Sequence, residues 1–216
     1  MSSVVPAPRP SSPPAWVRVL AVPPAVALVL VGIWVAGGIV TDDLRGSMAL
    51  TALWFAIVAG AAVVAWRRAA WLRPAAAAAV LAFAGVGGYL GYTSTTDRTV
   101  DEVLVSGPAA LEGSFRGLAH PTEGTAAVVE QGGELVLTLS DFRTDPGPDL
   151  FVYVVPGSSS GDDVDGGARL GRLKGNIGNQ QYAIPAGLDL AGGATVVVWC
   201  RAFSVSFGAA ELVPAA

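Results

Sequence analysis

Cys200 is the only cysteine in the chain, and it lies in an apolar run at residues 195–202 that predicts a buried strand. Alternation along this strand places the cysteine on the same face as Val196, Val198 and Ala202. The opposite face then carries Val197, Trp199, Arg201 and Phe203. A thiol on an apolar face has a raised pKa and low reactivity, which favours a structural cysteine.

The same cysteine also suits redox chemistry. Its sulfur could be a redox-active thiol or a soft ligand to the iron or copper of a cofactor. Such a cofactor could be lined by Trp199, Phe203 and Phe207. A single cysteine excludes an intrachain disulfide, and it excludes the zinc and iron–sulfur sites that need several cysteines. The sequence alone leaves the structural and the redox interpretation of Cys200 open.

His120 is the only histidine, and it lies in the turn segment LAHP. A blue-copper centre needs two histidines and a cysteine, usually with a methionine, but Met1 and Met48 both lie in the N-terminal half. A C-x-x-C-H segment is absent from the sequence, which excludes covalent c-type haem. The cofactor alternatives are non-covalent haem with Cys200 or His120 as its ligand, and no cofactor. No motif supports a Cys–His catalytic dyad, so the sequence favours a module that is not an enzyme.

An acidic loop carries Asp162, Asp163 and Asp165, followed by two glycines. Carboxylate oxygens are the ligands that Ca²⁺ prefers, although the spacing here departs from that of an EF-hand. Aspartate and glycine also favour exposed turns, so a solvated loop is the alternative. We expect Asp141 and Asp149 to stabilise turns through local bonds between side chain and backbone.

The composition divides the chain near residue 93. Of its 216 residues 52% are hydrophobic and 14% are charged, which is too apolar for an ordinary soluble protein. The apolar residues are concentrated between Val17 and Tyr92. After Thr93 the chain has seven Lys and Arg residues against fifteen Asp and Glu residues, a formal charge of −8. A domain this acidic has no basic surface for nucleic acid, so we expect no nucleic-acid partner.

Three segments between residues 17 and 92 are long and apolar enough to span a membrane, which makes the lipid bilayer the first expected partner. They cover residues 19–40, 48–66 and 74–92. A cleaved signal peptide is the alternative for the first segment, but its apolar run is longer than that of a signal peptide and no clear A-x-A site follows. The N-terminal half is therefore expected to be an α-helical membrane anchor.

The short loops predict how this anchor is oriented. Arg67, Arg68 and Arg73 gather between the second and third segments, whereas residues 41–47 carry two Asp and one Arg. Positively charged loops face the cytoplasm. The N-terminus is therefore expected on the cytoplasmic side of the plasma membrane, and the chain after the third segment on the outer side. Residues 1–16 are rich in proline and serine, which predicts a disordered cytoplasmic tail.

After a linker at residues 93–106, the sequence predicts one all-β domain at residues 107–216. Short alternating runs are separated by Gly, Pro, Asp and Ser about every eight to twelve residues, the pattern of a β-sandwich or barrel. The expected strands are residues 113–118, 124–130, 134–139, 150–155, 168–173, 181–184, 195–202 and 204–207. The fold class is thus a three-helix membrane anchor joined to a sandwich or barrel-like domain.

Four blocks in this domain resemble the electron-transfer DM-thirteen domain. The blocks are GSF at 113–115 with His120 and Glu123-Gly124, LSDFRTDPGPDLFVYV at 139–154, LGRLKGNIGNQQYAIP at 170–185, and VVVWCRAFSVSFGAAEL at 196–212. The resemblance extends over residues 107–213. It implies a β-sandwich-like module outside the membrane, with the family's cysteine at Cys200 and a proposed role in electron transfer. It brings no set of catalytic residues.

The sequence therefore predicts a membrane-anchored, extracytoplasmic redox or electron-transfer module that acts through Cys200. Relatives of the domain carry it beside redox modules, whereas this chain has only membrane helices in that place. We therefore expect a redox or cell-envelope protein as its partner. The alternative is a non-enzymatic β domain that binds or assembles with a cell-envelope partner.

Overall fold

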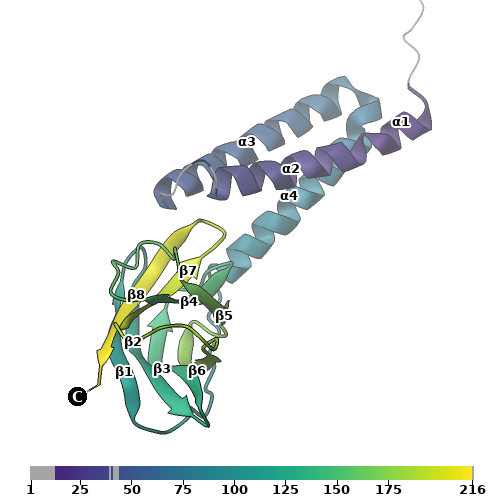
Figure 1. The fold of residues 1–216 in the computed structure, drawn as a ribbon. Helices are drawn as coiled ribbons and strands as arrows, with labels where there is room; N and C mark the ends of the chain where they lie inside the picture. Colours follow the sequence, from purple (N-terminus) through teal and green to yellow (C-terminus); the bar gives the residue numbers. More distant parts are fainter. Residues whose placement is uncertain (1–12, 39, 41–43, 216) are drawn as a thin grey trace, which may run out of the picture. The chain divides into compact units, whose positions relative to one another are not determined.

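The computed structural model describes residues 13–38, 40 and 44–215 of the chain (Figure 1). Its N-terminal part is helical. The helices are α1 (Ala15–Leu20), α2 (Val22–Gly38), α3 (Leu44–Arg68), the short 3₁₀ helix η1 (Ala70–Leu72) and α4 (Arg73–Thr93). Most of the predicted N-terminal tail and the middle of the first loop, residues 1–12 and 41–43, lie outside the described residues.

Among the residues that the structure describes, three helical spans are long and apolar enough to cross a membrane, as the sequence predicts. They are Ala15–Ala36, Gly46–Arg68 and Ala70–Thr93, with mean hydropathies of 2.4, 2.2 and 1.5. The first span consists of α1 and α2, which meet at Ala21. Pro23 and Pro24 lie in the first turn of α2, where a missing N–H costs no helical hydrogen bond.

The helices pack through small residues. The Trp54 indole N–H donates to the carbonyl oxygen of Val29 at 3.4 Å. A Cβ atom added to Gly32 would lie 2.0 Å from the Trp54 ring, so glycine is what lets this tryptophan lie against α2. Of the described residues, those within 13–33 and 51–86 form one compact unit, and those within 34–50 and 87–215 form a second.

The C-terminal domain is a single antiparallel sheet of eight strands. The strands are β1 (Ala109–Gly117), β2 (Thr122–Gln131), β3 (Glu134–Thr144), β4 (Leu150–Pro156), β5 (Ala168–Arg172), β6 (Ile177–Ala183), β7 (Ala194–Cys200) and β8 (Val205–Pro214). Their order in the sheet is β5-β4-β7-β8-β1-β2-β3-β6. The edge strands β5 and β6 contact each other, so the sheet is a nearly closed barrel (Figure 1). This confirms the predicted division into apolar helices and one β domain.

The chain between α4 and β1 runs along the edge strand β6. Val100 N–H donates to the carbonyl oxygen of Ile177 and Glu102 N–H donates to that of Asn179, both at 2.9 Å. A Cβ atom added to Gly178, which has φ +104°, would lie 2.0 Å from the Val100 carbonyl oxygen. The segment predicted as a linker therefore covers a sheet edge that would otherwise expose unpaired backbone groups.

The hairpin between β7 and β8 differs from its sequence prediction. The predicted strand at 195–202 ends at Cys200, and residues 201–204 form the turn, with Ser204 at φ +48°. The next strand continues past residue 207 to Pro214. A register shift lies opposite Val198 and Trp199, where Phe207 is the extra residue of β8.

Candidate functional site

Cys200 is completely buried in the main core of the barrel. Its exposed fraction is 0%, and its cluster includes Val196 and Val198 from the same strand. Val197 and Trp199 belong to a separate cluster on the other face of β7. The predicted alternation along this strand is therefore confirmed up to the cysteine.

The predicted alternation is wrong at Phe203. Because the chain turns after Cys200, Phe203 is partly buried against the same core as the cysteine and not on the opposite face. Trp199 points the other way. The two aromatic residues predicted to flank the sulfur thus lie on different sides of the sheet.

Burial controls the chemistry of the thiol. Loss of water around Cys200 raises its pKa from 9.0 to about 11, while backbone hydrogen bonds from Phe203, Ala202 and Asp149 act in the opposite direction. The sulfur is therefore a protonated thiol at neutral pH. In this conformation it is a weak nucleophile.

The loop at residues 145–150, DPGPDL, connects Cys200 to the other predicted site residue. Leu150 is paired with Cys200 across β4 and β7. At the other end of the loop, Asp145 Oδ2 lies 2.9 Å from His120 Nδ1. The His120 ring also stacks on Phe207 with 3.8 Å between ring centroids. Phe207 belongs to the same core cluster as the cysteine. The 145–150 loop and the Phe207 ring therefore both link Cys200 to His120.

Gly147 lets this loop lie close to the core. A Cβ atom at this position would lie 2.9 Å from Cζ of Phe207 and 3.0 Å from Cδ2 of Leu150. Contacts of about 3 Å or less require a neighbour to move, so a larger residue at this position would push Phe207 or Leu150 aside.

Asp149 links the loop to two arginines. Its Oδ2 accepts a hydrogen bond from Arg201 Nε at 2.8 Å, and Arg172 Nη2 lies 2.8 Å from Oδ1 in an ion pair without hydrogen-bond alignment. The expectation that Asp149 ties a local turn is therefore wrong, because its side-chain partners are distant in the chain, Arg172 on β5 and Arg201 in the turn after β7. At Asp141, with φ +50°, the backbone N–H is bound by Asn179 Oδ1, so a distant amide stabilises that turn.

Three arginines surround one aromatic ring on the outer face of β4. The guanidinium carbons of Arg169, Arg172 and Arg201 lie 5.3, 5.2 and 4.8 Å from the centre of the Phe151 ring. These distances are typical of cation–π contacts. Phe151 is paired with Trp199 of β7, so this arginine patch (Arg169, Arg172 and Arg201) lies one strand away from Cys200.

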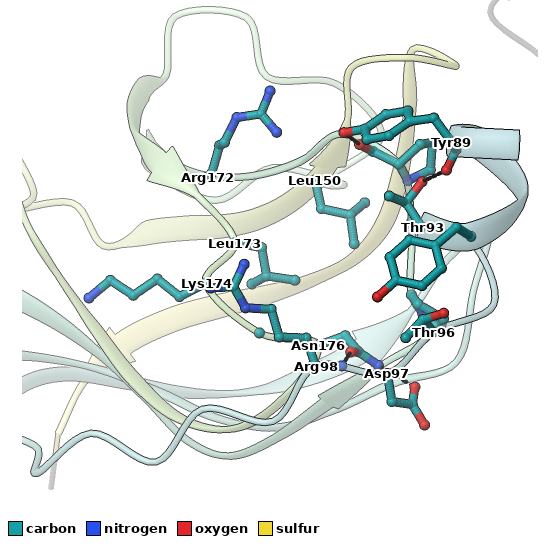
Figure 2. A pocket seen from close by; sticks show the side chains of 15 residues that line it. Tyr89, Thr93, Thr96, Asp97, Arg98, Leu150, Arg172, Leu173, Lys174 and Asn176 are labelled. Carbon is teal, nitrogen blue, oxygen red and sulfur yellow. Dashed lines mark hydrogen bonds between the residues drawn. The ribbon is translucent and has the colours of Figure 1, made fainter. Parts of the chain in front are cut away.

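A cavity of about 670 Å³ lies beside the same loop (Figure 2). Its lining includes Tyr89 and Tyr92 from the end of α4, Pro148 and Leu150 from the loop, and Arg98 and Arg172. All the lining residues belong to the second compact unit. Neither Cys200 nor His120 lines the cavity, so these predicted ligands are not placed to hold a haem in it.

Asp162, Asp163 and Asp165 lie in the loop between β4 and β5. Asp163 Oδ1 accepts a hydrogen bond from the backbone N–H of Asp165 at 3.1 Å, which is the bond of an exposed turn. Within residues 13–38, 40 and 44–215 no group of three or more His, Cys, Asp or Glu side chains is arranged to hold a metal ion. The calcium site stays a prediction, for which a thermal shift on adding Ca²⁺ that Asp163→Asn removes would be the evidence.

A helical part with candidate membrane spans, followed by a nearly closed antiparallel barrel, defines the class of protein. Residues 114–212 match the family model described as "Electron transfer DM13". Over these residues the β domain of this chain is therefore similar to electron-transfer DM13 domains. Comparison with curated proteins and with solved structures gave no match.

Asp145, Asp149 and Arg172 were not assigned a site role from the sequence. Their partners lie between 23 and 52 residues away in the chain, and no local pattern indicates such pairs. The DPGPDL segment is the sequence feature that marks the two aspartates, because its two prolines and its glycine fix a loop between two carboxylates.

Proposed function

We propose that the chain is a membrane-anchored, extracytoplasmic electron-transfer module that acts through Cys200. One observation carries this proposal: the loop at 145–150 joins Cys200, through its pairing with Leu150, to the arginine patch, through Asp149. The match of residues 114–212 to the electron-transfer DM13 model supports electron transfer as the role of the domain.

The charges around the helices support the proposed orientation. Arg67 and Arg68 end α3, and Arg73 begins α4 after the short η1 helix, so three cations lie at one end of two candidate spans. Cations concentrate on the cytoplasmic side of membrane helices. A cytoplasmic position for these arginines puts the end of α4 and the β domain on the other side of the membrane.

The burial of Cys200 favours electron transfer past the sulfur over disulfide exchange. A protonated thiol without solvent access is poorly suited to disulfide exchange in the native conformation. We therefore propose that the sulfur contacts the electron path to a partner's redox centre. The partner docks on the exposed side chains of Arg169 and Arg201, and an acidic protein surface is the complementary chemistry.

The test compares the full-length protein with Cys200→Ser and Cys200→Ala in detergent. A small acidic redox protein is added as the partner, and its absorption spectrum is recorded over a series of redox buffers. Wild type is expected to show a redox-linked change that both variants lose, whereas Trp199→Phe, on the opposite face, keeps it. An unchanged response in the folded Cys200 variants, with no bound cofactor, would refute the proposal.

A non-enzymatic binding domain is the second candidate, and the arginine patch is the observation that favours it. Exposed arginines stacked on an aromatic ring are common at protein interfaces. This function predicts that folded Cys200→Ser still captures a cell-envelope partner, while Arg169→Glu with Arg201→Glu does not. Arg143→Glu, which changes an exposed arginine on β3, is the matched control.

A further inference from the structure

The cavity beside the 145–150 loop combines an apolar surface with a polar one. Leu150 and Leu173 lie on one side, facing Tyr89 and Thr93 from the last turns of α4 (Figure 2). The Tyr89 hydroxyl donates to the carbonyl oxygen of Pro148 at 3.5 Å. A ligand with both an apolar and a polar part would contact both surfaces.

The cavity is also basic within an acidic domain. Arg98, Arg172 and Lys174 are among its lining residues, against Asp97 as the acidic member. These three are nearly half of the seven cations that follow Thr93, in a part of the chain whose formal charge is −8. This local excess of positive charge favours an anionic ligand.

The contacts of the three cations show which of them are available to bind an anion. Lys174 extends away from Tyr89 and binds both carboxylate oxygens of Glu102 at 2.8 Å (Figure 2). Arg172 contacts Asp149 through one nitrogen and keeps 61% of its side chain exposed. Arg98 has no carboxylate within ion-pair distance among the described residues. Arg172 and Arg98 therefore have guanidinium donors free for an anion.

The position in the chain identifies the source of that anion. The cavity begins at Tyr89 and Tyr92, in the last turns of the candidate span Ala70–Thr93. Tyrosines at the end of a span lie at the level of the lipid headgroups. We infer that the cavity binds the phosphate headgroup of an anionic phospholipid, with Arg98 and Arg172 as its phosphate ligands. This inference does not depend on redox chemistry at Cys200.

Hydrogen exchange of the full-length protein in lipid nanodiscs tests this site. Phosphatidylcholine nanodiscs are compared with nanodiscs that also contain phosphatidylglycerol, and exchange is followed at residues 93–98 and 172–176. Phosphatidylglycerol in tenfold excess over its dissociation constant should slow exchange there about tenfold. Arg98→Gln with Arg172→Gln should lose the effect, while Arg143→Gln keeps it. Exchange in β2 and β3 reports folding in the same samples.

Two further arms keep the result decisive. Arg98→Gln alone breaks no ion pair, so it should weaken the lipid effect even if the double variant folds poorly. Inorganic phosphate added to phosphatidylcholine nanodiscs should leave exchange unchanged. Equal exchange in both lipids, an effect that survives the arginine variants, or the same slowing with inorganic phosphate would overturn the inference.

Discussion

Leu150 on β4 lies directly opposite Cys200 on β7, and its side chain both packs in the cysteine's core cluster and lines the neighbouring cavity. This pairing joins the 145–150 loop to the strand that carries the buried sulfur. Substitutions in the loop should therefore affect the core, the arginine patch and the cavity together.

Cys200 should give the domain a pH-dependent stability above pH 9. The folded thiol has its pKa raised from 9.0 to about 11, so between these values the unfolded chain loses a proton that the folded chain keeps. Stability should be unaffected below pH 9 and fall by about 2 to 3 kcal/mol by pH 11. Urea unfolding across this range measures the slope. Cys200→Ala should lose the fall that begins at pH 9 and keep only the fall above pH 10 that comes from Tyr182, whose pKa is also raised by burial. An equal slope in the two proteins would contradict the assigned cause.

Asp149→Asn should weaken the arginine patch. The substitution removes the charge that pairs with Arg172 and Arg201 while keeping the shape of the side chain, which is only 16% exposed. The expected loss is about 1 to 3 kcal/mol of unfolding free energy. A double-mutant cycle with Arg201→Gln should give a coupling energy clearly above zero. Additive effects of the two substitutions would show that the pair is not coupled.

Gly147→Ala should destabilise the domain by about 1 to 3 kcal/mol, because the added methyl group has no room between Phe207 and Leu150. Gly192→Ala is the matched control, since a Cβ atom there meets nothing within 4 Å. Thermal unfolding of both variants measures the difference. If the two variants unfold at the same temperature, the loop is not packed as described.

Glu102→Gln should release the segment that lies along β6. Hydrogen bonds from Lys174, and a further one from the Gln181 backbone, hold the pKa of Glu102 below its ordinary value. The carboxylate therefore stabilises the fold above the unfolded pKa of 4.5, and this contribution is lost as the pH falls through the lower folded pKa. Amide exchange at Val100 and Glu102 should speed up in the variant at neutral pH. Unchanged exchange would show that the backbone bonds alone hold this segment.

The sequence allowed the eight strands and the core face of Cys200 to be predicted, because hydrophobic alternation is a local signal. The face assigned to Phe203 was wrong. The apolar run WCRAFSV continues through residues 201–204, so it gives no local sign of the turn there. The turn depends on the φ of +48° at Ser204, which composition does not indicate.

The partners of the loop carboxylates could not be predicted for a different reason. Asp149 meets Arg172 and Arg201 only after β4, β5 and β7 assemble into one sheet. Long-range ion pairs depend on topology, and strand alternation does not encode which distant residues become neighbours. The family resemblance marked the same segments without showing their contacts.

Voltammetry of the full-length protein, alone and after addition of a small acidic redox protein as electron carrier, tests the central claim most directly. The account predicts that electrons pass between the electrode and the added redox protein through wild type and Trp199→Phe, and that folded Cys200→Ala loses this current. Exchange at the wild-type rate in Cys200→Ala would contradict the claim that the module acts through this cysteine.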